Sequence, residues 1–283
     1  MPISAIGAVE KLTAQLDKNN IVQYQLPLAA IEQDGEQQSI ALNPLIGQML
    51  TLVFHSKIAC KKCGKITKKS YSQGFCYPCM AKLAQCDMCI MKPETCHHHL
   101  GTCREPEWGE QHCMVDHYVY LSNTSALKVG ITRHTQLPTR WIDQGATQAL
   151  PIFKVSTRLQ SGLVETALAE LVSDKTNWRA MLKGSNDDID LKSQAKILIP
   201  KIAQRLADIK LKYGDDAVKL LDENVVSIVY PVSQYLTKIS SFNFDKTPTV
   251  SGILLGIKGQ YLIFEQGVIN MRKFSSYQIS VKY

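Results

Sequence analysis

The sequence lacks any apolar run that reaches the roughly 18 residues needed to span a bilayer. Residues 1–20 also lack the basic segment and following apolar stretch that mark a secretory leader. We therefore expect a cytoplasmic protein with no membrane association. Charged residues make up only 20% of the chain and hydrophobic residues 45%, which is the ordinary composition of a soluble globular protein.

Cysteine, by contrast, is concentrated in one segment of the chain. All nine cysteines lie between residues 60 and 113. In a reducing compartment, cysteines in spaced pairs are more often metal ligands than disulfides. Cys60-x2-Cys63 and Cys76-x2-Cys79 each place two thiolates on a tight knuckle, and two knuckles complete the tetrahedron that zinc prefers. These four cysteines therefore predict a structural zinc site.

A second cysteine cluster predicts a second zinc site, but the spacing leaves its ligands open. Cys86-x2-Cys89 forms a third knuckle, and Cys103 closes the cluster. The remaining ligand is either Cys96, which gives a four-cysteine site, or His99, which gives the closing spacing H-x3-C.

Cys113 and His117 follow the second cluster and could also contribute ligands. We interpret them instead as a buried thiol and a histidine at the start of a strand. Both predicted sites contain enough sulfur to saturate zinc, which leaves no open position for a catalytic water. The segment has few large apolar side chains, so metal binding should supply most of its folding energy.

The same segment carries the positive charge of the chain. The formal net charge is +7, and residues 57–104 contain nine Lys and Arg against two Asp and Glu, an excess of seven. Lysine here either keeps a small domain soluble or forms a face that binds a polyanion. The clustering of these lysines favours a nucleic-acid-binding face. We assign to this face Lys61, Lys62, Lys65, Lys68, Lys69 and, further along the chain, Arg133.

Three aromatic residues, Tyr71, Phe75 and Tyr77, interleave with these lysines. Aromatic faces beside cations suit stacking on unpaired bases. The alternative is that they pack over the knuckles as a small core, and the sequence does not separate the two interpretations.

Strand-like runs lie at both ends of the chain, with other elements between them. We expect the two ends to pair into one small β-barrel, and Pro200 to kink or split a helix over 187–213. Asn177 should cap a short helix. The expected fold is α+β and multidomain: a β-rich N-terminal region over 1–57, zinc knuckles over 58–117, an α/β domain over 118–185, a helical segment over 186–222 and a β-rich C-terminal region over 223–283.

The α/β domain has a specific order of elements, namely strand, strand, helix, strand, helix. Tyr118-Val119-Tyr120-Leu121 and Lys128-Val129-Gly130-Ile131-Thr132 form the first hairpin, a helix over 137–146 carries Arg140, and a helix over 162–174 carries Glu165. With these motifs, residues 117–185 resemble the GIY-YIG endonuclease superfamily. The first strand is similar to the GIY strand, and the second to the YIG strand with lysine in the tyrosine position.

This resemblance implies a site that cleaves phosphodiesters with a divalent metal. Tyr118 or Tyr120 would act as general base, Arg140 would clamp the phosphate, and Glu165 would hold Mg²⁺ or Mn²⁺. Lys128 departs from the family pattern, because lysine binds phosphate but is a poor general base unless it is desolvated. The domain is therefore expected either to cleave nucleic acid or only to bind it.

The whole chain also resembles an uncharacterised family of bacterial and archaeal proteins that join such knuckles to segments like CREPEWG and DKTNW. We expect a zinc-stabilised protein that binds nucleic acid, with RNA favoured over DNA because knuckles and small barrels with interleaved aromatics suit single strands. The alternative is a non-catalytic zinc scaffold that binds another protein and retains a retired nuclease core.

Overall fold

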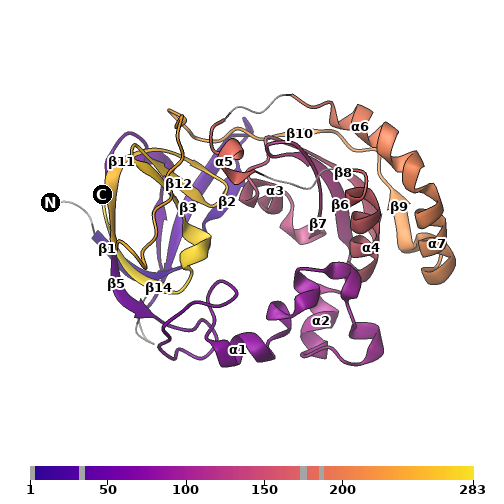
Figure 1. Ribbon diagram of the computed structural model, residues 1–283, viewed down its shortest axis with the longest axis horizontal. Coiled ribbons are helices and arrows are strands. Elements are labelled where there is room, and N and C mark those ends of the chain that lie inside the picture. Colours follow the sequence, from indigo (N-terminus) through magenta and orange to yellow (C-terminus); the bar gives the residue numbers. More distant parts are fainter. Residues whose placement is uncertain (1–3, 32–35, 173–176, 185–187) are drawn as a thin grey trace.

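The computed structural model describes residues 4–31, 36–172, 177–184 and 188–283. Two antiparallel sheets lie on opposite sides of the molecule, and the cysteine-rich segment runs along one edge between them (Figure 1). In the described residues, no helix is long and apolar enough to cross a membrane.

The first sheet is built from both ends of the chain. Its strand order is β13-β12-β11-β5-β14-β1-β3-β2, with β4 paired to β3, and it curls into a half-barrel. Because β1 pairs with β14 and β14 with β5, the terminal regions pair in one sheet, but this sheet is a half-barrel and not the small β-barrel that the sequence predicted. The strands are β1 (Ser4–Val9), β2 (Thr13–Leu16), β3 (Val22–Ala29), β4 (Gln38–Ala41), β5 (Met49–Ile58), β11 (Thr249–Lys258), β12 (Tyr261–Phe264), β13 (Gly267–Asn270) and β14 (Tyr277–Lys282).

Two features shape the first sheet: the alternation of side chains along β5 and a glycine in β11. Leu50 and Leu52 of β5 are fully buried on the concave face of the half-barrel, where the largest apolar core lies. The β11–β12 register shifts between Leu254 and Gly256. A Cβ at Gly256 would lie 2.6 Å from Val232 Cα, so only glycine lets the backbone at Val232 pack against β11 at this position.

The second sheet has the order β10-β8-β6-β7, with β9 paired to β8. Helices α4, α6 and α7 cover one of its faces and enclose a second apolar core. On β6, Val119 and Leu121 enter that core, whereas Tyr120 enters the core of the half-barrel. The elements are β6 (His117–Asn123), β7 (Leu127–Arg133), α3 (Thr139–Asp143), β8 (Gln148–Val155), α4 (Arg158–Ala169), α6 (Leu191–Leu198), α7 (Ala203–Tyr213), β9 (Val218–Leu220) and β10 (Val226–Ser227).

The helix boundaries follow local capping signals. The predicted order β6, β7, α3, β8, α4 is observed, but α4 begins at Arg158, before the predicted residue 162, because Thr157 and Gln160 form a capping box. Residues 173 and 174 of the predicted helix lie outside the described residues. Asn177 caps α5 (Trp178–Met181), as predicted, and Pro200 falls in the 3-10 turn η7 (Ile199–Ile202), which separates α6 from α7.

The cysteine-rich segment is made of short turns and two short helices, α1 (Tyr77–Lys82) and α2 (Pro106–His112). Its first half is attached to the half-barrel, because Ser276 Oγ donates a hydrogen bond to Gly74 O at 3.0 Å and Ser70 Oγ donates to Ser275 O at 2.9 Å. Its second half packs on α4 through η4 (Pro93–Thr95). The segment therefore bridges the two sheets.

Candidate metal centre and cationic cavity

Cys60, Cys63, Cys76 and Cys79 lie together, and their four sulfur atoms are all within 4.8 Å of one another. The Cys63 and Cys76 sulfurs are 3.8 Å apart. Two thiolates that share one tetrahedral zinc, each about 2.3 Å from the ion, stand about 3.8 Å apart. This group could hold a metal ion, as its spacing in the sequence predicts.

Local backbone structure aims these thiols at one point. Gly64, with φ +70°, donates its N–H to Cys60 O at 2.8 Å and closes the first knuckle. Burial raises the pKa of the Cys60 thiol, but backbone hydrogen bonds from Cys76, Cys63 and Lys62 outweigh burial and lower it to about 6. Burial and the neighbouring thiols raise the pKa of Cys79 to about 12, so within this group the thiolate, which is the form that binds metals, is favoured at Cys60.

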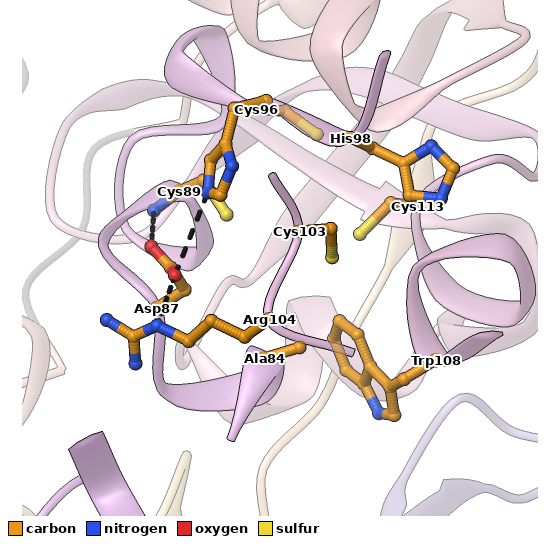
Figure 2. Close-up of a pocket in the computed structure, with 10 residues that line it drawn as sticks. Ala84, Asp87, Cys89, Cys96, His98, Cys103, Arg104, Trp108 and Cys113 are labelled. Atoms are coloured by element: carbon orange, nitrogen blue, oxygen red, sulfur yellow. Dashed lines mark hydrogen bonds and ion pairs between the residues drawn. The ribbon is translucent and has the colours of Figure 1, made fainter. Parts of the chain in front are cut away.

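A second group of cysteines surrounds a small cavity of about 10 Å³ (Figure 2). The thiols in its wall are Cys89, Cys96, Cys103 and Cys113. Asp87, His97 and His98 also line the cavity. Asp87, Cys89 and His97 form another set whose atoms lie within 4.8 Å of one another.

Two residues predicted as ligands of the second site lie elsewhere in the structure. Cys86 packs against the small core beside the first group, with Phe75 and Leu83. His99 is exposed and lines a separate groove next to α7.

A cavity of about 320 Å³ lies where four distant parts of the chain meet. Five cations and two carboxylates line it, an excess of three positive charges: Lys11, Arg133, Arg140, Arg158, Arg272, Asp143 and Glu165. Ile90, Met91 and Pro93 of the cysteine-rich segment form one wall. We call this the cationic cavity.

The charges in the cationic cavity are close enough to influence one another. Burial lowers the pKa of Arg158 and of Arg272, and the positive charge of Arg140 lowers both further. Lys11 forms an ion pair with Asp143, which also accepts a hydrogen bond from Gln260 Nε2 at 2.8 Å. The arginines therefore form a concentrated positive region next to Glu165, which suits an anion.

The cationic cavity brings together some of the predicted catalytic residues and not others. Arg140 and Glu165 both line it, with Arg133, whereas its described lining does not include Tyr118, Tyr120 or Lys128.

Tyr120 belongs to the core of the half-barrel, although the charges of Arg140 and Glu165 are close enough to act on its hydroxyl. Its side chain is fully buried, its hydroxyl donates to Gln144 Oε1 at 2.8 Å, and burial raises its pKa to about 12. Its ring lies against Gly130, where a Cβ would be 2.6 Å from the Tyr120 hydroxyl. Such a phenol is a poor general base near neutral pH.

The predicted lysine face is exposed, but its aromatics divide between surface and core. All five lysines from Lys61 to Lys69 are exposed. Tyr77 is 60% exposed and contacts Tyr71 edge-on, whereas Phe75 is buried with Cys60 and Leu83. Only the tyrosines therefore remain available for stacking.

Sequence reasoning missed Lys11, Arg158 and Arg272, three of the cations in the cationic cavity. Each is a single basic residue without a motif, and only folding brings them together.

Comparison with known proteins adds the family. Residues 47–279 match the profile of a family described as "Protein of unknown function (DUF2797)". No curated protein and no solved structure is significantly similar to the chain. The matched region includes every cysteine and every residue of the cationic cavity except Lys11. The chain belongs to the DUF2797 family, in agreement with the expected uncharacterised family.

Proposed function

We propose that this protein binds nucleic acid and holds a backbone phosphate in the cationic cavity. The observation that carries the proposal is the convergence of Arg133, Arg140, Arg158 and Arg272 on one cavity of about 320 Å³. Half-buried arginines are costly to crowd together unless an anion neutralises them. The planar guanidinium matches the oxygens of a phosphate through paired hydrogen bonds.

The exposed lysine face extends this site along the surface. Lys61 Nζ lies 3.3 Å from Glu10 Oε1, and Glu10 precedes Lys11 of the cationic cavity. On the other side, Arg272 donates a hydrogen bond to Gln73, in the loop that leads to the tyrosines. A strand with its phosphate in the cavity would thus pass beside Tyr77, and stacking on that exposed ring favours single-stranded RNA.

Zinc is the metal we assign to the first cysteine group. Four thiolates saturate a tetrahedral ion and suit zinc better than hard cations, which prefer oxygen. The ion would be structural: it would hold the lysine-bearing loop against the half-barrel.

Metal-dependent phosphodiester cleavage is a second candidate, and one observation favours it. Glu165 lines the same cavity as Arg140, on elements that follow the order expected from the GIY-YIG resemblance. There Glu165 would hold Mg²⁺ or Mn²⁺ while Arg140 contacts the phosphate. The burial of Tyr120 supports binding over cleavage, because this phenol is not placed to accept a proton from water.

Binding is tested by fluorescence anisotropy with labelled single-stranded RNA, single-stranded DNA and duplex DNA across a range of salt concentrations. We expect tightest binding to single-stranded RNA, and steep weakening by salt. Arg140→Ala should weaken binding to all sequences and lower the salt slope by about one. Arg205→Ala is the matched control, since Arg205 is exposed on α7 and pairs with Glu170 at 3.9 Å.

If the wild type binds no nucleic acid at low salt, or if Arg140→Ala binds as tightly as Arg205→Ala, the binding proposal is wrong. Cleavage is tested separately with Glu165→Gln in Mg²⁺ and Mn²⁺. The variant should bind normally and lose all cleavage. Absence of cleavage by the wild type would remove the second candidate and leave binding in place.

A further inference from the structure

We propose that Cys89, Cys96, Cys103 and Cys113 form a second metal centre, which takes a thiophilic ion such as zinc and holds Arg158 in the wall of the cationic cavity. This ligand set includes Cys113 and leaves out Cys86 and His99.

The cavity between the four thiols has the size of a single ion. Its volume of about 10 Å³ corresponds to about one water-sized sphere. Cys89, Cys96 and Cys113 are almost fully buried, at 9%, 6% and 4% exposed. Figure 2 shows the four side chains around this one space. Burying three thiols beside the half-buried Cys103, in a segment with little apolar core, is accounted for by a shared metal.

Each thiol comes from a different turn of the segment. Cys89 lies in η3 (Met88–Ile90), Cys96 follows η4, Cys103 precedes α2, and Cys113 is the C-cap of α2. No three of these four sulfurs, all of which lie in the described part of the chain, are within 4.8 Å of one another, unlike the sulfurs of the first group. Binding an ion would draw the four sulfurs together by side-chain rotation around the cavity that all four line.

The histidines and the carboxylate beside this cavity have other partners. His97 Nδ1 lies 2.7 Å from Thr102 Oγ1 while its Nε2 lies 3.7 Å from Asp87 Oδ2, and His98 Nε2 lies 3.1 Å from Glu110 Oε1. Asp87 pairs with Arg104 Nε at 2.6 Å. The four thiols therefore suit a thiophilic ion such as zinc better than Asp87, Cys89 and His97 do.

A glycine keeps space open at the same cavity. A Cβ at Gly109 would lie 2.6 Å from His98 Cδ2 and 3.3 Å from Cys103 Sγ. Gly109 O also accepts the Cys113 N–H at 2.7 Å, so the turn of α2 that carries Gly109 places Cys113 beside Cys103.

Arg158 connects this cluster to the cationic cavity. Its backbone N–H donates to Cys113 O at 2.8 Å, and its guanidinium donates to Ile90 O at 2.7 Å and Cys89 O at 3.4 Å. A metal that ties Cys89 to Cys113 would fix all three acceptors. Arg158 and Ile90 both line the cationic cavity, so the ion would set the shape of that wall. The effect on ligand binding rests on the proposed function.

The test uses the count of cysteines. The chain has nine, and two four-thiolate centres leave only Cys86 without a metal. In the zinc-loaded full-length protein, native alkylation followed by mass spectrometry should label Cys86 and protect the other eight. Labelling of Cys113 with protection of Cys86 would overturn the ligand assignment.

Metal analysis of matched variants gives a second measurement. The wild type and Cys86→Ser should each bind two zinc ions per chain, and Cys113→Ser one. A wild type with one zinc, or Cys86→Ser with one and Cys113→Ser with two, would overturn the proposal. If Cys113→Ser fails to fold, the wild type loaded with Co²⁺ decides the question. Each of its two cobalt ions should then give thiolate-to-cobalt charge-transfer bands of the same strength. A single strong band set from one ion per chain would count against the second centre.

The link to Arg158 is measured by RNA binding at equal salt. Cys113→Ser, with its first metal retained, should weaken binding as much as Arg158→Ala, whereas Cys86→Ser should bind like the wild type. Equal binding by all three would overturn the link. If the wild type binds no RNA but carries two zinc ions as described, the metal centre stands and the proposed function fails.

Discussion

Tyr120 on β6 and Gly130 on β7 lie opposite each other in the first hairpin, and their close contact requires glycine at position 130. A Cβ at Gly130 would lie 2.6 Å from the Tyr120 hydroxyl and 2.7 Å from its Cζ. Because the ring is fully buried and hydrogen-bonded to Gln144, it has little freedom to move. We expect Gly130→Ala to reduce the free energy of unfolding by about 1–3 kcal/mol.

Urea denaturation measures this loss, and the Tyr120→Phe background is its control. Removing the hydroxyl takes away the nearest clashing atom, so the alanine should cost less in that background. An equal cost in both backgrounds would show that the Tyr120 hydroxyl is not the cause.

The buried environment of His117 predicts that the stability of the protein depends on pH. It is fully buried, its Nδ1–H donates to Val115 O at 2.7 Å, and among the described residues its Nε2 has no hydrogen-bond partner. Burial lowers its pKa to about 4. The folded protein therefore prefers neutral imidazole. This stability is present above the unfolded pKa of about 6.5 and is lost as the pH falls toward 4.

We expect the wild type to lose about 2 kcal/mol more stability than His117→Asn as the pH falls from about 7 to about 5. Loss of the proposed metals at low pH would affect both proteins equally, so the comparison between them cancels it. Parallel curves of unfolding free energy against pH would contradict a buried neutral His117.

At the scale of elements, the packing of η4 on α4 depends on one glycine. A Cβ at Gly162 would lie 2.3 Å from Glu94 N and 2.6 Å from Pro93 C. Both atoms belong to backbone, so they cannot move aside without moving the turn. We expect Gly162→Ala to lower the free energy of unfolding by about 3 kcal/mol and to weaken the proposed RNA binding, because Pro93 belongs to the wall of the cationic cavity.

Thr166→Ala is the control on the same helix, since Thr166 is exposed, and it should change stability by no more than about 0.5 kcal/mol. Urea denaturation and RNA titration provide the measurements. If Gly162→Ala has the same stability and the same RNA affinity as this control, the packing of η4 on α4 does not require glycine at position 162.

At the scale of the whole molecule, the two sheets and the cysteine-rich segment differ in what stabilises them. The half-barrel and the helix-covered sheet each have a large apolar core. The core beside the first cysteine group consists of Cys60, Phe75, Cys76 and Leu83 with a few partly buried neighbours. Chelation should therefore open the cysteine-rich segment while both sheets stay folded.

Limited proteolysis with mass spectrometry checks this expectation. With chelator, cleavage should concentrate between residues 60 and 113, and zinc should protect the same bonds. Cleavage spread evenly over both sheets would show that the metals stabilise the whole fold.

Local patterns in the sequence were enough to predict several features. The spacing of Cys60, Cys63, Cys76 and Cys79 predicted their association because each pair closes a knuckle within a few residues. The breaks at Pro200 and Asn177 followed from backbone chemistry that acts on neighbouring residues. The pairing of the terminal strands was also expected, from the strand-like runs at both ends of the chain.

The cationic cavity and the second sulfur cluster could not be predicted in the same way. Cys86 has the spacing of a knuckle partner for Cys89, yet it turns toward the core beside the first group, and Cys113 occupies the second cluster instead. Lys11, Arg158 and Arg272 carry no motif.

The sequence by itself determined the first cysteine group, the element order and the helix breaks, since these depend on contacts between residues close in the chain. Only the tertiary structure decided which thiols and which cations meet, because sheet pairing and the packing of η4 on α4 join residues that are far apart in the chain.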